Sequence, residues 1–411
     1  MAQICRRWRN IIFGLPWRLD LRVLCTNATP TRTSLGIWPP FPISVQCGHI
    51  HWAVDEKGSS NVIAAFEHSD RISDIDIINI NGSALEILAA VMQGPFPILR
   101  YFYLRSTDES IPVVPETFLF LGGSTPRLRR FALSSIPFLS LPKFVFSATW
   151  IEYLTLHDIP NSGYISPEVM ATCLAALPNL YSLSIGFRSP LSRPIQINPP
   201  PLSRTVLPAL FYLCFLGVSK YLEDFVAQIE TPLLGKLHIV PCMDLIFHIP
   251  QLHDFIRRTE GLMLPWNHAC MDFTRPMIKI TLGSPSRFRV EIQCERPDWQ
   301  LSSVIQIFSQ PLPLLSHIEQ LEIREGYCSE HTRWKDGPDM DSSLWLELFH
   351  LFISVQSLYV CKLLAPPVTT ALQELGKGRT MEVLPALRNV SLEGLQPAGP
   401  VQNAIQSFVA S

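Results

Sequence analysis

The stretch "PRLRRFALSSI" (residues 126–136) places Leu128, Phe131, Leu133 and Ile136 at the spacing L-x-x-L-x-L-x-x-I. The central L-x-L pair alternates with period two, as the side chains of a short strand with one buried face do. A single copy of this spacing is common in any apolar chain. Its recurrence therefore decides whether the sequence encodes a repeat.

The spacing does recur. Several copies begin with a proline and a second apolar residue, as in "PILRYFYL" (97–104), "PNLYSLSI" (178–185), "PALFYLCF" (208–215) and "PALRNVSL" (385–392). The third apolar residue of each copy serves as a marker, and successive markers are 23 to 37 residues apart. The markers are Ile77, Leu104, Leu133, Leu156, Ile185, Phe215, Ile239, Leu264, Ile292, Ile323, Val360 and Leu392.

Helical patterns lie between the markers, at residues 83–93, 166–177, 221–229 and 342–355. One strand and one helix at this period are typical of a leucine-rich repeat. The sequence thus predicts an α/β fold, an irregular leucine-rich-repeat-like solenoid (horseshoe) over residues 17–411. Irregularity is expected because the polar residue usually found three positions after L-x-L is mostly Ile, Val or Leu here. An unrelated α/β fold is the alternative.

The composition sets the class of protein. With 411 residues, 47% of them hydrophobic and 17% charged, the chain is too apolar to be disordered. No apolar run reaches the ~18 residues that span a bilayer, and "NIIFGL" is shorter than the ~7–15 residues of a secretory signal. The ten cysteines are scattered without a C-x-x-C pair. We therefore expect a soluble protein of the cytoplasm or nucleus, without a membrane partner.

The N-terminus is locally basic. Six arginines oppose only Asp20 through residue 33, whereas the whole chain has a formal net charge of −2. On a helix, Ile4, Trp8 and Ile12 form one apolar stripe flanked by arginines, as in a helix that packs on a partner surface. The same pattern fits a packing helix with a solvated face. Nucleic-acid binding is disfavoured because the pI is about 6.6.

The segment "ICRRWRNIIFGLPWRLDLRVLC" (4–25) resembles the second half of an F-box, whose last helix carries a C-[RK]-x-W-R signature. With "NVIAAFEHSDRISDIDI" (61–77) and "VLPALRNVSLEGLQPAGPVQ" (383–402), almost the whole chain resembles F-box proteins of mushroom-forming fungi. The resemblance implies that residues 1–16 form a remnant F-box that docks on the Skp-type adaptor of a cullin–RING ubiquitin ligase, while the repeats bind an unknown protein substrate. The expected adaptor-binding residues are Ile4, Cys5, Arg6, Trp8, Arg9 and Ile12.

The Leu-Pro and acidic helix that open an F-box are not present before Cys5. A truncated F-box is therefore expected, through a misassigned start codon or through loss of half the module. In the second case the chain is a repeat scaffold that no longer binds the adaptor.

The sequence carries no signature of an active site. It contains no G-x-S-x-G, G-x-G-x-x-G, G-x-x-x-x-G-K-[ST] or H-E-x-x-H pattern. We expect no enzyme activity and no cofactor, with an unrecognised hydrolase as the weakest alternative. Cys47, His49 and His51 would share one face of a strand, as zinc ligands can. Such residues in an aromatic-rich strand are more often core residues, so no metal site is predicted.

The polar neighbours of the buried strand residues should line a concave, solvent-facing surface. Tyr and Arg dominate binding hot spots because they combine a large contact area with a polar tip, although exposed strands favour Tyr in any case. The predicted partner-binding residues are Tyr101, Tyr103, Arg105, Arg130, Tyr153, His157, Tyr212, Lys236 and His238, followed by Gln320, Glu322 and Arg324.

Overall fold

The computed structural model divides the chain into two compact units. Unit 1 consists of residues 1–210 and 228–231, and unit 2 of residues 211–227 and 232–411. The residues that the structure describes are 14, 21–26, 28, 30–48, 56–108, 120–123, 125–188, 203–241, 249–263, 266–283, 286–309, 315–326, 341–375 and 383–393.

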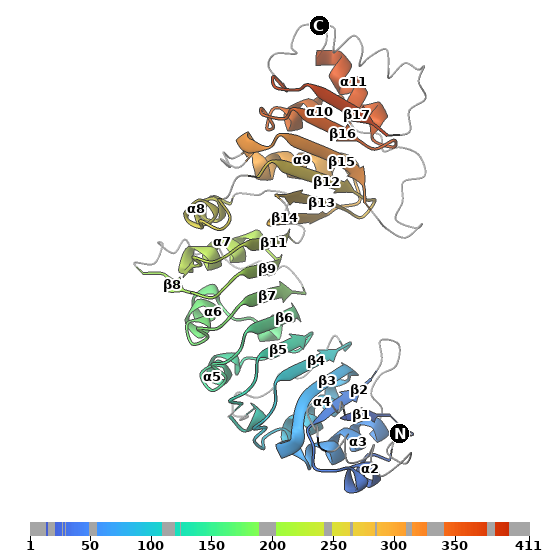
Figure 1. The fold of residues 1–411 in the computed structure, drawn as a ribbon, viewed down its shortest axis with the longest axis vertical. Helices are drawn as coiled ribbons and strands as arrows, with labels where there is room; N and C mark the ends of the chain where they lie inside the picture. Colours follow the sequence, from blue (N-terminus) through green and yellow to red (C-terminus); the bar gives the residue numbers. More distant parts are fainter. Residues whose placement is uncertain are drawn as a thin grey trace. The chain divides into compact units, whose positions relative to one another are not determined.

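Unit 1 contains a parallel sheet whose strands pair in chain order (Figure 1). The strands are β1 (Leu21–Cys25), β2 (Ile43–Cys47), β3 (Ile72–Ile80), β4 (Tyr101–Ser106), β5 (Arg130–Ser134), β6 (Tyr153–Ile159) and β7 (Ser182–Phe187). The short β8 (Thr205–Val206) and β10 (Ile229–Glu230) pair separately. The helices between the strands are α2 (Thr31–Ile37), α3 (Glu56–Phe66), α4 (Gly82–Val91), α5 (Leu141–Val145) and α6 (Pro167–Leu174), with 3₁₀ turns at Ser69–Arg71, Phe120–Gly123 and Asn161–Gly163.

Unit 2 also has one sheet, in the order β9-β11-β14-β13-β12-β15-β16-β17. β13 is antiparallel to both of its neighbours, and the other pairs are parallel. The strands are β9 (Tyr212–Gly217), β11 (Lys236–Pro241), β12 (His268–Phe273), β13 (Met277–Leu282), β14 (Phe288–Gln293), β15 (Gln320–Glu325), β16 (Ser357–Val360) and β17 (Asn389–Leu392). The helices are α7 (Ser219–Gln228), α8 (Pro250–Arg258), α9 (Pro297–Phe308), α10 (Ser342–Phe349) and α11 (Ala365–Leu375), with a 3₁₀ turn at Leu315–His317.

A tight turn explains the proline that announces many repeats. The Leu128 N–H donates to the Thr125 carbonyl at 3.1 Å, with Pro126 between them, and Leu180 and Leu387 close the same turn after their prolines. Proline suits the second position of such a turn because its φ is already fixed near −65°. The turn buries the first apolar residue of the repeat, as Leu128 shows with 0% exposure.

One carbonyl connects several of the repeats to the next. The N–H groups of Arg129 and Arg130 both donate to the Arg100 carbonyl at 3.0 Å, and those of Glu152 and Tyr153 both donate to the Arg129 carbonyl. In unit 2, Gln356 and Ser357 share the Glu319 carbonyl in the same way. This bifurcated contact sets where each new strand begins and hence its register.

The markers confirm the predicted strand stacking within each unit. In unit 1, Ile77, Leu104, Leu133, Leu156 and Ile185 are register partners on adjacent parallel strands. In unit 2, Phe215 pairs with Ile239, while Ile323, Val360 and Leu392 form a second run. The chain is thus a mixed α/β protein built on parallel sheets. The helices predicted at 83–93, 166–177, 221–229 and 342–355 are present as α4, α6, α7 and α10.

One marker of unit 2, Ile292, lies on a strand, β14, but outside the register row of the other markers. Val290, not Ile292, lies in register with Ile239, and Met271 is the partner of Ile323. Leu264 lies outside the described residues, and residues 260–262 just before it form a turn. The reason is the β12–β14 meander, in which β13 reverses direction and interrupts the assumed period of one parallel strand per repeat.

The predicted irregularity is also present. Ile80, Ile136 and Ile159 occupy the position three residues after the marker, and all three are buried. One residue earlier, Asn79, Ser135 and Asp158 take left-handed backbone conformations with φ of 58°, 62° and 51°. The β3–β4 and β6–β7 registers shift at this point. The strands therefore bulge so that an isoleucine can enter the core where a polar residue is usual.

Aromatic residues fill the core of unit 1 beside the markers. The rings of Phe102 and Phe131, register partners on β4 and β5, stack with centroids 5.4 Å apart. Phe144 of α5 lies 4.7 Å from Phe131 and joins the helix to the sheet. Helices α2, α3 and α4 contact one another in chain order. Among the described residues, no helix is long and apolar enough to cross a membrane.

Truncating a buried marker side chain should destabilise the protein. We expect Leu133→Ala and Leu156→Ala each to lower the free energy of unfolding by about 2–5 kcal/mol, because each leaves a cavity between stacked strands. Urea unfolding followed by circular dichroism measures this change. Val169→Ala is the matched control, since Val169 is 45% exposed and its truncation should change stability by less than about 0.5 kcal/mol. A control-sized effect at Leu133 would contradict its burial in the stack.

Candidate partner-binding face

The strands of unit 1 carry a continuous polar row on the face opposite the core. Strand register places Asp74, Tyr101, Arg130 and Tyr153 side by side on β3 to β6. A second row begins with Asp76 and Tyr103. We call these six residues, Asp74, Asp76, Tyr101, Tyr103, Arg130 and Tyr153, the tyrosine face. Arg130 is exposed and the other five are partly exposed.

The tyrosine face is partly ordered by its own contacts. The Arg130 guanidinium carbon lies 4.6 Å from the centre of the Tyr153 ring, a cation–π contact. The Tyr153 ring is in turn 5.9 Å from that of Tyr181. Burial, together with Asp76 and Tyr103, raises the pKa of Tyr101 to about 12, so its hydroxyl remains a neutral donor at physiological pH.

Asp74 and Asp76 lie at one end of the face. Ser73 Oγ donates to Asp74 at 2.6 Å, but within the described part of the chain neither Asp74 nor Asp76 forms an ion pair. Burial raises the pKa of Asp76 above its usual value, because a carboxylate loses hydration there without gaining an opposite charge.

Arg105 and His157 lie further along the same strands. Arg105 is exposed at the end of β4, while His157 Nε2 contacts Ser184 Oγ at 2.6 Å. Burial lowers the pKa of His157, so this ring is neutral near pH 7. His157 thus contributes a neutral polar contact next to the tyrosine face.

In unit 2, the predicted residues Tyr212, Lys236 and His238 lie on β9 and β11, beside a denser set of charges. We call this set the charged face. Its ion pairs are His238–Glu291 at 3.5 Å, Arg289–Glu291, Lys279–Asp272 at 3.1 Å, His268–Glu322 at 3.3 Å and Arg324–Glu322. Every carboxylate of the charged face therefore has a cationic neighbour.

Within the charged face, His238 has a strongly shifted pKa. Burial by itself lowers the pKa of His238, but the Cys214 sulfur and the Glu291 carboxylate outweigh burial and raise that pKa to about 9. The contact with His238 holds the pKa of Glu291 below its usual value. His238 is thus an imidazolium at neutral pH.

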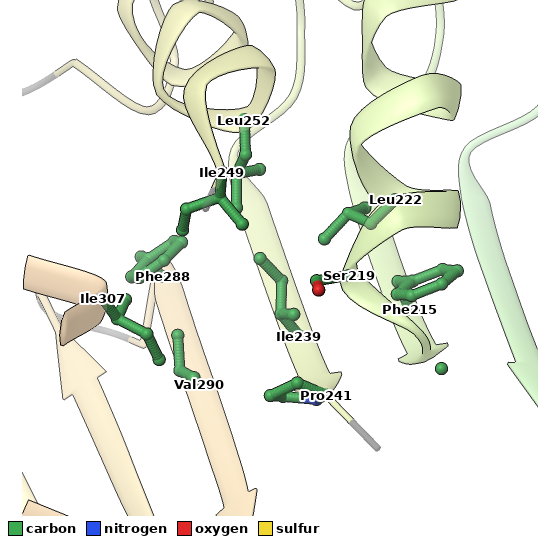
Figure 2. Close-up of a pocket in the computed structure, with 11 residues that line it drawn as sticks. Phe215, Ser219, Leu222, Ile239, Pro241, Ile249, Leu252, Phe288, Val290 and Ile307 are labelled. Carbon is green, nitrogen blue, oxygen red and sulfur yellow. The ribbon is translucent and has the colours of Figure 1, made fainter. Parts of the chain in front are cut away.

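Two hollows differ sharply in chemistry. The first lies in unit 2 between α7, α8 and the sheet, and Figure 2 shows apolar side chains such as Phe215, Ile239, Leu252 and Phe288 around it. Apart from the hydroxyl of Ser219, the side chains that line it are apolar. The second is lined by Arg100, Pro126, Arg127, Arg129 and Trp150 of unit 1. Arg129 is already paired with Glu152 at 3.1 Å.

Other predicted sites cannot be located in the structure. The adaptor-binding residues Ile4, Cys5, Arg6, Trp8, Arg9 and Ile12 lie outside the described residues, as do His49 and His51 of the weak metal motif. Among the residues that are described, no group of three His, Cys, Asp or Glu side chains is placed to hold a metal ion.

Sequence reasoning missed several residues of both faces. Asp74 and Asp76 alternate with buried isoleucines in "ISDIDI", and this alternation was sufficient to place them beside Tyr101 and Tyr103. Lys279, Arg289 and Glu291 belong to two alternating runs, "MIKITL" and "FRVEIQ", separated by a short Gly-Ser-Pro-Ser-containing segment. That arrangement is the signal of a hairpin, which a search for parallel repeats overlooks.

Comparison with known proteins gives distant neighbours in structure, one of them a repeat protein. No protein-family model matches the chain, and no curated protein matches it significantly. A leucine-rich repeat-containing protein, LegL7 from Legionella pneumophila, aligns over 96% of this chain and 98% of its own, with 11% sequence identity and a TM-score of 0.31.

The His238–Glu291 contact predicts a pH dependence of stability. The pKa of His238 rises from an ordinary 6.5 to about 9 on folding, so its contribution is complete below pH 6.5 and is lost as pH rises to about 9. The urea midpoint of the wild type should fall between pH 6.5 and 9, and His238→Gln should flatten that decline. The exposed His350→Gln serves as control and should keep the wild-type profile. Identical profiles for His238→Gln and the wild type would contradict the raised pKa.

Proposed function

We propose that this chain is a non-catalytic protein-interaction module and the substrate-recognition subunit of a cullin–RING ubiquitin ligase in the cytoplasm or nucleus. Its tyrosine face binds a partner segment that carries a cationic side chain. The observation that carries the partner-binding part is the pair of partly buried carboxylates, Asp74 and Asp76, beside Tyr101 and Tyr103.

The chemistry of the tyrosine face favours a Lys or Arg of the partner. A cation placed between the two carboxylates would supply an opposite charge that no described residue provides as an ion pair. The tyrosine rings would contact its aliphatic stem or its charged head. Arg130 lies two strands away from Asp74, a distance of about 10 Å at normal strand spacing. An acidic residue of the partner could pair with Arg130 and so fix the direction in which the segment binds.

The charged face is less suited to bind such a partner, because its charges are already paired with one another. Its carboxylates are each paired with His, Arg or Lys, so a partner would have to separate existing ion pairs before forming new ones. Separation costs most for His238–Glu291, because these side chains are only 16% and 14% exposed and would be left with an uncompensated charge. The tyrosine face requires no such exchange.

The ubiquitin-ligase part of the proposal is supported by sequence alone. The basic segment of residues 1–16 has the C-x-x-W-R pattern of an F-box helix and an apolar stripe of Ile4, Trp8 and Ile12. A repeat scaffold without adaptor binding is the alternative, and adaptor binding distinguishes the two.

Selection of binding peptides tests the partner chemistry. Peptides selected from a random library on the full chain should be enriched in Lys or Arg, and Asp76→Asn or Tyr103→Ala should weaken the selected peptides at least about tenfold. Because burial raises the pKa of Asp76, binding should decline at a higher pH during acidification than it would with an ordinary aspartate. Titration of a labelled peptide by fluorescence anisotropy measures both effects.

A matched control separates the two faces. Gln320→Ala changes an exposed residue of β15 in unit 2 and should leave peptide affinity unchanged. Selection of acidic peptides, or equal losses for Gln320→Ala and Asp76→Asn, would refute the assignment to the tyrosine face.

Adaptor binding tests the N-terminal segment. Trp8 should anchor the helix, since a buried tryptophan contributes about 150–250 Å² of contact. Trp8→Ala should abolish pull-down of a Skp-type adaptor, while Trp38→Ala, which changes a tryptophan outside residues 1–16, should retain it. Circular dichroism checks that both variants fold. Failure of the wild-type chain to bind the adaptor would favour the scaffold instead.

A further inference from the structure

A thiol, an imidazole and a carboxylate lie in line on the solvent side of the unit 2 sheet. Cys214 Sγ of β9 is 3.4 Å from Nδ1 of His238 on β11. On the far side of the ring, Nε2 lies 3.5 Å from Oε1 of Glu291 on β14. Each residue is on a different strand, and the parallel pairing of β9, β11 and β14 holds the three in this order.

The surroundings of this group are cationic on balance. Tyr212 contributes a neutral hydroxyl 3.5 Å from His238 Nδ1, since burial raises the pKa of Tyr212 to about 12. Lys236 precedes His238 by two residues on the same face of β11, and Arg289 is the register partner of His238. Among the described residues, the carboxylate that contacts this group is that of Glu291. Such an environment favours the thiolate form of a cysteine.

A second cysteine on the same sheet face lacks this arrangement. Cys270 on β12 is 7% exposed, close to the 5% of Cys214, so access by a small reagent is similar. Its sulfur lies 3.5 Å from a carboxylate oxygen of Asp272 instead of an imidazole. Burial and Asp272 raise the pKa of the Cys270 thiol to about 12. Cys270 is therefore an internal reference for an unreactive thiol.

We propose that Cys214, activated by His238 and Glu291, is a modification site at which small disulfides and thiosulfonates add a thio group to the protein. His238 Nδ1–H stabilises the thiolate, and Glu291 keeps the imidazole protonated. The assignment concerns the reactivity of Cys214 and is independent of any partner of the tyrosine face.

The chemistry of the step is thiol–disulfide exchange. The Cys214 thiolate attacks one sulfur of the reagent, a new S–S bond forms and the original S–S bond breaks. The leaving sulfur departs with the electron pair and takes the proton of the His238 imidazolium. Cys214 is oxidised to a mixed disulfide, and the leaving sulfur is reduced to a thiol. With a thiosulfonate, the leaving group is a sulfinate.

The test uses methyl methanethiosulfonate on the full chain and measures the modification rate of each cysteine by peptide mass spectrometry. The thiolate is the reacting form, and an imidazolium beside Cys214 favours it whereas a carboxylate beside Cys270 disfavours it. We therefore expect Cys214 to react at least about fivefold faster than Cys270 at pH 6.5. His238→Gln should remove this advantage, and the Cys214 rate should then rise only in alkaline solution.

Two rates, those of Cys214 and Cys270, are also compared in the unfolded protein. In urea, where the strands no longer hold His238 beside Cys214, the two cysteines should react at similar rates. If His238→Gln does not fold, the Cys214 to Cys270 ratio in the folded wild type and its loss in urea still decide the matter. Equal rates for Cys214 and Cys270 in the folded protein, or a folded His238→Gln with an unchanged Cys214 rate at pH 6.5, would overturn the proposal.

Discussion

The fold depends on one backbone contact, the carbonyl that receives two successive N–H groups from the following repeat. Arg100, Arg129 and Glu152 provide it in unit 1, and Asn267, Glu319 and Gln356 provide it in unit 2. Where this contact is present, the second donor is the first residue of the strand, so the marker three residues later lies in the same row. A slip by one residue would expose every marker, because side chains alternate between the faces of a strand.

This fixed register also determines which side chains are exposed to solvent. Since Leu104, Leu133 and Leu156 are held in line on the core side, their neighbours are held in line on the other side. A row of side chains therefore crosses several strands, although the residues are 23 to 29 positions apart in the sequence. Tyr101, Arg130 and Tyr153 become neighbours in this way, and so do Cys214, His238 and Arg289. Both faces arise from the repeat and not from loops.

Much of this arrangement could be predicted from the sequence, and the failures have a physical cause. Apolar spacing predicted the strands, the intervening helices and the exposure of Tyr101 or His238, because burial follows directly from alternation. It did not predict that Cys25 and Cys47 continue the marker row, since the series of markers began only at Ile77. The β12–β14 meander was missed because parallel and antiparallel strands share the same alternation. Ion pairs such as His238–Glu291 depend on which strands are adjacent, and spacing along the chain does not give that order.

The two faces differ in how their charges are balanced, and this difference has a structural origin. In unit 2, the antiparallel β13 brings Lys279 opposite both Glu291 and Asp272, so cations and carboxylates from neighbouring strands neutralise one another. In unit 1, all strands are parallel and their charges were not interleaved by such a reversal. Asp74 and Asp76 therefore meet tyrosines on β4, and the next cation, Arg130, lies one strand further and stacks on Tyr153. The antiparallel strand thus explains why the carboxylates of the charged face are paired, whereas Asp74 and Asp76 form no ion pair with a described residue.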